Sequence, residues 1–260
     1  MKEFTLPENL KSRAKEKPPF VIDTPGNWLI LNDLHMPHSD DTTVTAAIRA
    51  AKKAKVVGIL LNGDIMDSAE ISRHDRDAES EDYCTEIAMV REFLAMIRNE
   101  FKDARIVYKA GNHEERLDSY IMKNAPAFKD LEGFNLPSLL HLEEQGIAWV
   151  KDRRVIKLGK LNVIHGHEYN GSGGVSPARW LYLRAGDCAI MGHCHRTSEH
   201  HKREITDYNV ATWSIGCACH LKPRWCSQNE WNHGFAIVEL GSNGDFVVHN
   251  KRVHKDGRVF

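Results

Sequence analysis

Residues 56–67 read VVGILLNGDIMD, an apolar run that passes directly into polar and acidic residues. Its first part is a short apolar run with a β-branched start, which predicts a buried strand over Val56–Asn62. Polar residues follow at once, and Asp64 and Asp67 stand among them. Open α/β sheets bind their ligands beyond the carboxyl ends of their strands. The stretch therefore predicts an α/β fold whose chemistry lies at strand ends.

The same order, a strand followed by polar residues, recurs along the chain. Four further motifs each follow a predicted strand: Asp33-Leu34-His35, Gly111-Asn112-His113-Glu114, His165-Gly166-His167 and Gly192-His193-Cys194-His195. In the D-x-H and H-x-H motifs, a spacing of two places both side chains on one side of an extended segment, where both can reach one ion. Glycines before Asp64, Asn112 and His193 permit the sharp turns that convergence at one point requires.

The residue types in these motifs indicate metal chemistry. The chain has 15 histidines, and neutral imidazole is the commonest side-chain metal ligand. Mixed carboxylate, imidazole and amide ligands suit Mn²⁺, Fe²⁺, Ni²⁺ or Zn²⁺ better than Ca²⁺. Two such ions about 4 Å apart clamp the attacking and leaving oxygens of a phosphoryl displacement. We therefore expect two divalent metal ions, with Mn²⁺ as the first choice.

Apolar periodicity predicts the remaining elements. The predicted strands are Asn27–Asn32, Val56–Asn62, Arg105–Ala110, Ile147–Val150, Val155–Leu158, Leu161–Ile164, Cys188–Met191, Asn209–Ile215, Phe235–Leu240 and Phe246–His249. The predicted helices follow the cap at Asp40 and Asp41, cover Ser80–Phe101, Glu114–Lys123 and Leu136–Gln145, and start at Ser176 and Pro177. Strands that first alternate with helices and then form a meander predict two sheets packed together with helices outside.

The chain shows no internal boundary of composition. We expect an N-terminal leader over residues 1–20, mobile or peripheral, and a single domain over residues 21–260. No segment approaches the roughly 20 consecutive apolar residues of a membrane span, and the leader has no apolar run of the kind that a secretory signal needs. We therefore expect a cytoplasmic protein without membrane contact.

Charge and cysteine content limit the classes of binding partner and of structural cross-link that we expect. The net charge is −1, so the chain lacks the overall positive charge of polyanion binders, which favours a small molecule or a nucleotide over long DNA. Six cysteines are too few for a disulfide scaffold at this length. Cys217, Cys219, His220 and Cys226 have the residue types of a structural zinc site but lack paired C-x-x-C spacing, so free thiols are the preferred interpretation.

In their residues and in their order along the chain, the five motifs resemble those of the calcineurin-like metallophosphoesterase family over roughly residues 27–240. The resemblance implies a four-layer αββα sandwich of two mixed β-sheets flanked by helices. It assigns one metal ion to Asp33, His35, Asp64 and His195, and the other to Asp64, Asn112, His165 and His193. Asp64 and a hydroxide would bridge the two ions.

The resemblance also supplies catalytic roles and a subgroup. His113 resembles the family's histidine that protonates the leaving oxygen or contacts the phosphate, and Asp67 would orient it. Ser68 stands where protein serine/threonine phosphatases continue with Arg-Gly, and Met66 stands where purple acid phosphatases have a tyrosine. The chain therefore resembles stand-alone bacterial or phage-type phosphoesterases.

Two further residues are candidates for substrate contact. Arg116 is able to donate to a phosphate oxygen, although a solvated ion pair is the preferred interpretation, and His167 is a candidate because it follows His165 by two residues. The predicted function is a phosphodiesterase that uses a metal-bridging hydroxide. A phosphomonoesterase and a DNA nuclease are the alternatives, and a non-enzymatic scaffold is disfavoured because every ligand position is filled.

Overall fold

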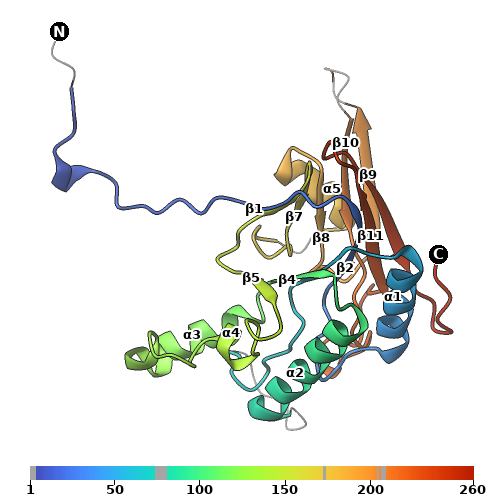
Figure 1. Cartoon of the computed structure of the whole chain (residues 1–260), viewed down its shortest axis with the longest axis horizontal. Coiled ribbons are helices and arrows are strands. Elements are labelled where there is room, and N and C mark those ends of the chain that lie inside the picture. Colours follow the sequence, from blue (N-terminus) through green and yellow to red (C-terminus); the bar gives the residue numbers. More distant parts are fainter. Residues whose placement is uncertain (1–3, 74–80, 172–173, 204, 206–208) are drawn as a thin grey trace.

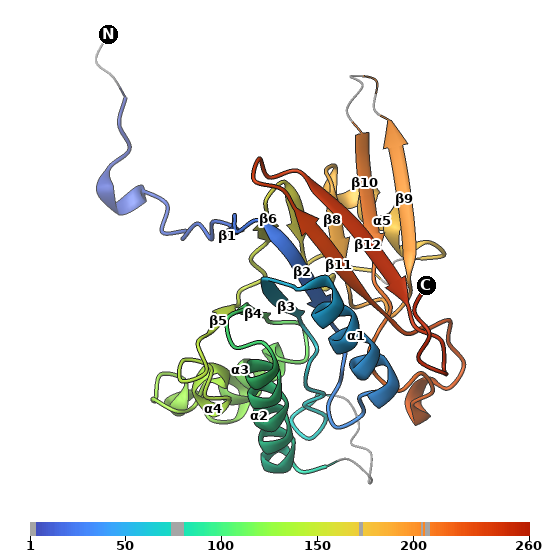
Figure 2. The ribbon, with the colours of Figure 1, turned by 45° about the vertical axis from the view of Figure 1, so that its right-hand side comes forward.

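A computed structural model describes residues 4–73, 81–171, 174–203, 205 and 209–260. The chain forms two six-stranded sheets, which pack face to face. Figures 1 and 2 show the two sheets side by side, with α1 and α2 on the outer face of one and α5 on the other. Both sheets contain parallel and antiparallel neighbours. The predicted αββα sandwich of two mixed sheets with flanking helices is confirmed.

The second sheet has the order β12-β11-β2-β3-β4-β5. Its strands are β2 (Gly26–Leu31), β3 (Gly58–Asn62), β4 (Arg105–Lys109), β5 (Ile147–Val150), β11 (Gly234–Leu240) and β12 (Phe246–Arg252). β2 to β5 lie parallel in sequence order, and the helices that connect them cover one face. β11 adds to β2 in the antiparallel direction.

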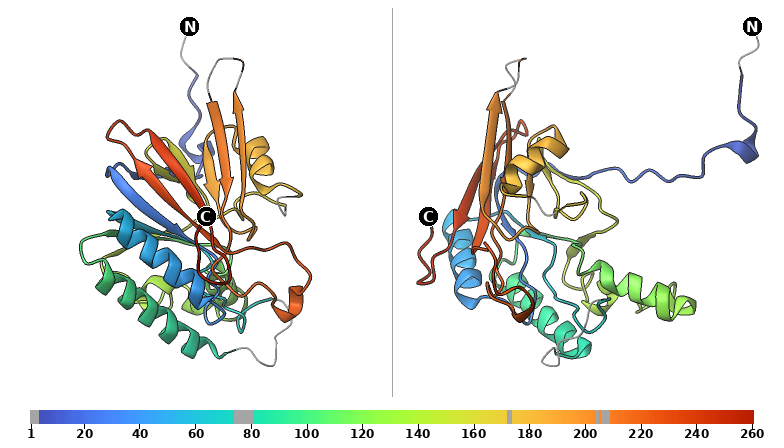
Figure 3. Two further views of the ribbon diagram at one scale, coloured as in Figure 1. Left: turned by 90° about the vertical axis from the view of Figure 1, so that its right-hand side faces the viewer. Right: turned by 180° about the vertical axis from the view of Figure 1, so that it is seen from behind.

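The first sheet has the order β1-β6-β7-β8-β10-β9. Its strands are β1 (Phe20–Ile22), β6 (Ile156–Leu158), β7 (Leu161–Val163), β8 (Ala189–Met191), β9 (Ser198–Arg203) and β10 (Asn209–Ser214). β7 and β8 are parallel neighbours, so their carboxyl ends meet at one edge. The chain before β1, residues 4–19, is exposed, and it runs away from both sheets (Figure 3).

Side-chain alternation along the strands explains the layers. Leu29 and Leu31 of β2 pack toward the helices, whereas Trp28 and Ile30 pack between the two sheets. The helices are α1 (Asp41–Ala54), α2 (Tyr83–Glu100), α3 (Glu115–Asn124), α4 (Leu136–Leu139) and α5 (Pro177–Ala185), with short 3-10 turns η1 (Glu8–Leu10), η2 (Pro126–Phe128) and η3 (Arg224–Cys226). None of the helices in the described ranges is long and apolar enough to cross a membrane.

One local expectation was wrong, and two strands were not predicted. The helix predicted over Leu136–Gln145 ends at Leu139, because His141 takes a left-handed conformation with φ of 53°. β1 was not predicted because it has only three residues, and β9 was not predicted because its sequence SEHHKR lacks apolar alternation. β9 lies at a sheet edge, where backbone pairing with β10 forms a strand from polar residues. The predicted helix start at Ser80 lies outside the described residues.

Candidate metal centre

The five motifs meet where the carboxyl ends of both sheets come together. The second sheet brings the residues after β2, β3 and β4, and the first sheet brings those after β7 and β8. Backbone hydrogen bonds join neighbouring loops: Asp33 N donates to Gly63 O over 3.1 Å, and Gly192 N donates to His165 O over 2.8 Å. The site is therefore built from strand ends that the sheets themselves hold in place.

The backbone at the predicted ligands is left-handed. Five of them have φ between 46° and 62°, namely Asp33, His35, Asp64, His193 and His195. The expectation that the D-x-H and H-x-H pairs converge on an extended segment is therefore wrong. Non-glycine residues adopt this conformation at an energetic cost, and such residues cluster at functional sites. The left-handed residues turn the chain so that side chains two apart both face inward.

The glycines beside the ligands serve two different purposes. Gly63 has φ of 86° and makes the turn that was predicted before Asp64. Gly192 has no such conformation, but a Cβ there would lie 2.7 Å from Asp33 Oδ2. A Cβ on Gly111 would likewise collide with Asp64 Oδ1. These two glycines therefore allow close approach of a carboxylate rather than a sharp turn.

The predicted ligand atoms lie close together and are buried. His195 Nε2 lies 3.3 Å from both Asp33 Oδ1 and His35 Nε2. His165 Nε2 lies 3.2 Å from Asp64 Oδ2, and the rings of His165 and His193 lie 5.2 Å apart. Ligand atoms of Asp64, His165 and His193 all lie within 4.8 Å of one another. Separations near 3 Å are those of donor atoms that share one ion at about 2.1 Å.

Three of these atoms are buried without a hydrogen-bond partner. They are Asp33 Oδ1, Asn112 Oδ1 and His165 Nε2, each from a different strand end. A buried polar atom without a partner costs about 1–3 kcal/mol. The other nitrogen of His165, Nδ1, lies 2.8 Å from the carbonyl oxygen of Asn62, which leaves Nε2 free to bind an ion. The residues present therefore fit divalent cations.

Neighbouring charges set the protonation of this cluster. Burial raises the pKa of Asp33, but His195 and His165 outweigh burial and hold that pKa at about 2. Burial and the nearby His165 lower the pKa of His193 to about 4. Burial lowers the pKa of His165, but Asp64 outweighs it and raises that pKa to about 10. A cation at this position would therefore replace a proton on His165.

Most of the chain, including all five motifs, matches a known protein family. A profile of the calcineurin-like phosphoesterase family matches residues 27–215, which is more than half of the chain. The chain belongs to the calcineurin-like phosphoesterase family. The matched range contains all seven predicted metal ligands as well as His113 and Asp67. A search of curated proteins finds no match.

Several solved structures are similar to this phosphoesterase over most of its length. A Vps29 variant from Entamoeba histolytica is 14% identical, covers 90% of this chain and 96% of its own, and gives a TM-score of 0.47. Yfce, a phosphoesterase from E. coli, is 14% identical with coverages of 86% and 98% and a TM-score of 0.41. A dimetal phosphatase from Danio rerio is 10% identical with coverages of 86% and 93% and a TM-score of 0.39.

His113 lies beside the predicted ligands His35 and Asp64, with ligand atoms of all three within 4.8 Å of one another, and it is held by Asp67. Its Nδ1 lies 2.6 Å from the Asp67 carbonyl oxygen and 3.2 Å from Asp67 Oδ1, and its Nε2 lies 3.8 Å from Asp64 Oδ2. Asp67 Oδ1 also lies 3.1 Å from His35 Nδ1. Burial lowers the pKa of His113, but Asp64 and Asp67 outweigh burial and raise that pKa above its ordinary value. One carboxylate thus orients a predicted ligand and the predicted acid together.

The structure places the two candidate substrate contacts in different settings. Arg116 Nη1 donates to the Asp67 carbonyl oxygen over 2.6 Å, and its Nη2 lies 3.0 Å from His113 Nε2. Arg116 is therefore part of the site and not a solvated ion pair. His167 is 8% exposed, and its Nε2 lies 3.2 Å from Glu115 Oε1. Its ring lies 5.3 Å from that of His165, beside the predicted ligands.

Glu114 is a residue of the site that was not singled out from the sequence. Its buried carboxylate accepts from Asp64 N and Ile65 N over 2.9 Å each, from Gly111 N over 2.7 Å and from Tyr108 Oη over 2.8 Å. It therefore ties the turn after β3 to the turn after β4. The signal in the sequence was a glutamate two positions after the predicted ligand Asn112, inside the same motif.

A second anchor holds the turn after β7. Glu168 accepts from Gly166 N over 2.7 Å and pairs with Lys109 Nζ over 2.8 Å. Lys109 is fully buried, and it also donates to Arg154 O over 2.7 Å. Burial raises the pKa of Glu168, but Lys109 outweighs it and holds that pKa at about 2. The pair connects β4 of one sheet to the histidine turn of the other.

The segment between β10 and β11, residues 215–233, covers the cluster from outside. Cys219 Sγ lies 3.9 Å from His195 Nδ1, and ligand atoms of Cys219, His35 and His195 lie within 4.8 Å of one another. The Trp231 ring contacts the His195 ring at 4.1 Å between centroids. Among the described residues, Cys219 thus groups with the predicted metal ligands and not with Cys226, and all six cysteines are free thiols.

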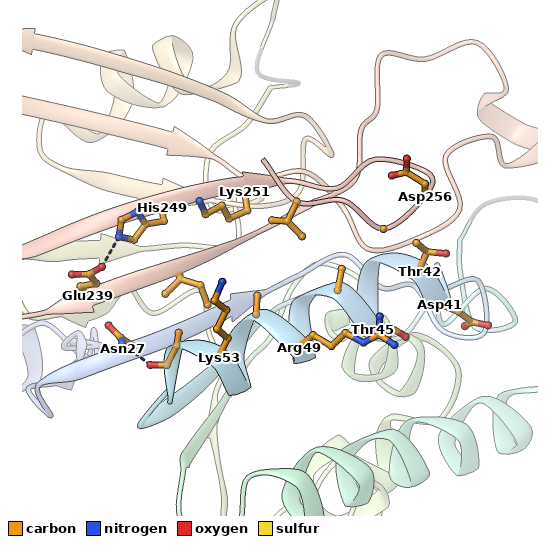
Figure 4. Close-up of a pocket in the computed structure, with 16 residues that line it drawn as sticks. Asn27, Asp41, Thr42, Thr45, Arg49, Lys53, Glu239, His249, Lys251 and Asp256 are labelled. Atoms are coloured by element: carbon orange, nitrogen blue, oxygen red, sulfur yellow. Dashed lines mark hydrogen bonds and ion pairs between the residues drawn. The ribbon is translucent and has the colours of Figure 1, made fainter.

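A groove lies away from the predicted metal ligands. It has a volume of about 940 Å³ and runs between α1 and the β11–β12 pair with the chain after β12 (Figure 4). Its walls carry charges of both signs, with Arg49 and Lys53 on α1 and Glu239 paired to His249 on the strands. None of the seven predicted ligands lines it. Volume alone therefore does not locate the chemistry of this protein.

Proposed function

We propose that this protein is a phosphodiesterase that works with two divalent metal ions. The observation that carries the proposal is the set of buried atoms without a hydrogen bond, Asp33 Oδ1, Asn112 Oδ1 and His165 Nε2, which stand after strands of both sheets. Asp33, His35, Asp64 and His195 would hold one ion, and Asp64, Asn112, His165 and His193 the other. When bound, two such ions polarise a phosphate ester and supply a hydroxide as nucleophile.

His113 would act on the leaving oxygen. Its Nδ1 is fixed by Asp67, so only Nε2 can face a substrate. Nε2 accepts from Arg116 Nη2 in the free protein, so His113 would take up a proton at Nε2 for an alkoxide once Arg116 has moved. Arg116 Nη2 occupies that direction in the free protein, and an arriving phosphate oxygen would draw the guanidinium away from His113.

The charges around the site favour a diester over a monoester. A monoester brings close to two negative charges at neutral pH, and a diester brings one. Arg116 is the cation beside His113 that would turn to one phosphate oxygen, whereas Arg196 already pairs with Glu230 over 2.6 Å. These contacts would balance the single charge of a diester better than the second charge of a monoester. We therefore place phosphomonoesters second, and the net charge of −1 places DNA third.

The proposal is tested with a matched pair of substrates. Purified protein is stripped of metal, reloaded separately with Mn²⁺, Fe²⁺, Ni²⁺ and Zn²⁺, and assayed with bis(p-nitrophenyl) phosphate and p-nitrophenyl phosphate. We expect turnover that depends on added metal, with Mn²⁺ effective, and a kcat/KM about 10-fold or more higher for the diester. A higher kcat/KM for the monoester would make the protein a phosphomonoesterase. Turnover of neither ester with any metal would contradict an enzymatic function.

A further inference from the structure

A cleft of about 380 Å³ opens beside the predicted ligand His193. Its lining residues are His193, Cys194 and Arg196 from the turn after β8, and Asn229, Glu230 and Trp231 from the segment before β11. Small-molecule sites in proteins typically measure about 300–1,000 Å³. The cleft is therefore large enough for a substituent of the phosphate ester, and it adjoins the position where the ester would bind. We call it the Trp231 cleft.

Trp231 is held in place by its own segment. Its backbone N donates to Asn229 Oδ1 over 2.9 Å, and Asn229 Nδ2 donates to Leu221 O over 2.7 Å and to Cys226 O over 2.6 Å. The indole ring meets the His195 ring at an interplanar angle of 63°. The wall of the cleft is thus fixed before a ligand arrives, which lowers the entropy cost of stacking on it.

Other lining residues of the cleft are polar. Arg196 Nη1 pairs with Glu230 Oε2 over 2.6 Å, and its Nη2 donates to the carbonyl oxygen of Gly174. The Glu230 side chain is 78% exposed, whereas that of Arg196 is 17% exposed. An aliphatic ligand would desolvate these groups without offering hydrogen bonds in return. A flat ring with polar edges satisfies both sides of the cleft.

We propose that the Trp231 cleft binds the nucleobase of a nucleotide phosphodiester, with the base stacked on Trp231 and its polar edge toward Arg196 and Glu230. This inference rests on the proposed phosphodiesterase function and names its substrate class. Indole rings stack on any base, so the cleft favours nucleotides in general over one base in particular. Trp231 is thereby a specificity-determining residue that does not contact the reacting atoms.

The test compares two esters with one leaving group. Thymidine 5′-(p-nitrophenyl phosphate) and methyl p-nitrophenyl phosphate differ only in the group that the cleft would hold. We expect the wild-type protein to prefer the nucleotide ester in kcat/KM. Trp231→Leu keeps apolar contact with His195 but loses the aromatic face, and it should reduce this preference about 10-fold or more. Trp231→Phe should keep most of the preference, and Trp149→Leu on β5 should keep all of it.

Each other outcome decides the question. Equal losses of kcat/KM on both esters in Trp231→Leu would overturn the proposal and make Trp231 a support for His195. A wild-type protein with equal kcat/KM on both esters would also overturn the proposal. Metal content of each variant is measured on the same samples. If the wild-type protein turns over neither ester, the phosphodiesterase proposal fails, and calorimetric binding of thymidine 5′-monophosphate to the metal-free protein then tests the cleft alone. If the wild-type protein binds thymidine 5′-monophosphate and Trp231→Leu does not, the nucleobase site is supported. If the wild-type protein does not bind it, the nucleobase site is overturned.

Discussion

At the scale of single residues, the left-handed backbone of five predicted ligands needs support from its surroundings. Such conformations cost about 1–3 kcal/mol each outside glycine. Glu114 provides part of that support, because it accepts the backbone N–H groups on either side of the bend at Asp64. His193 N in turn donates to Asp33 Oδ2 over 2.8 Å. The site is therefore held by hydrogen bonds between its own motifs.

Removing the Glu114 carboxylate should destabilise the protein strongly. Glu114→Ala would leave four backbone N–H groups and the Tyr108 hydroxyl without their acceptor in a buried place. We expect the free energy of unfolding to fall by at least about 3 kcal/mol in metal-free protein, measured by urea titration. Glu114→Gln keeps one acceptor oxygen and should lose less. A loss below about 1 kcal/mol for Glu114→Ala would show that the anchor is dispensable.

His113 should affect chemistry without affecting metal content. His113→Ala should keep both ions and lose about 10²- to 10⁴-fold in rate on an alkyl or nucleoside diester, whose leaving group needs a proton. The loss should be much smaller on a nitrophenyl diester. Asp67→Asn should show the same pattern more weakly and should also loosen the ion at His35, because Asp67 contacts both histidines. Equal losses on both kinds of ester would assign His113 to phosphate binding, and a lost ion would make it a ligand.

At the scale of elements, the predictions succeeded where local pattern decides the structure. The strands that carry the motifs formed as expected, and Asp40 caps α1 by accepting from Thr43 N over 2.7 Å. The contributions of the β10–β11 segment were not predicted, because it lacks periodicity and only the packing of two sheets brings Cys219 and Trp231 against His195. Polar β9 was missed for a related reason, since strand pairing and not hydrophobicity forms it.

Cys219 should help to orient His195. A ligating histidine usually donates its second N–H to a neighbouring acceptor, and here Cys219 Sγ lies at that nitrogen. Cys219→Ala should weaken binding of one ion by about 10- to 100-fold while the other stays bound, and Cys219→Ser should restore part of the affinity. Competition with a metal chelator measures both sites, and Cys188→Ala, directly before β8 in the core between the two sheets, is the control. Two unchanged affinities in Cys219→Ala would contradict this role.

Glu86 should make stability depend on pH. It lies on α2 and accepts from Ser68 N over 2.7 Å, and burial followed by the nearby Asp67 raises its pKa to about 7. The folded chain holds this proton more tightly than the unfolded chain, so the stability from Glu86 is complete below about pH 4.5 and is lost as pH rises through about 7. Relative to Glu86→Gln, the free energy of unfolding of the wild-type protein should fall by about 3 kcal/mol across that pH window, as measured by urea unfolding. If the stability of the wild-type protein and that of Glu86→Gln changed in parallel with pH, the raised pKa of Glu86 would be contradicted.

At the scale of the whole molecule, the sandwich brings together residues that are far apart in the chain. Asp33 and His195 stand 162 positions apart in sequence, yet their side chains lie 3.3 Å apart. Motif order predicted which residues gather, because parallel strands end at one edge. It did not predict how they are held, since Glu114, Glu168 and Lys109 act through contacts between turns that no single stretch contains.

The binuclear centre is tested most directly by the metal content of Asp64→Asn. Metal per chain is measured by mass spectrometry after reloading and gel filtration, and diester turnover is measured on the same samples. We predict two ions per chain in the wild-type protein, and in Asp64→Asn a loss of metal together with turnover, because Asp64 would bind both ions and the amide supplies less charge. An Asp64→Asn protein that keeps two tightly bound ions and a near-normal rate would contradict the binuclear centre.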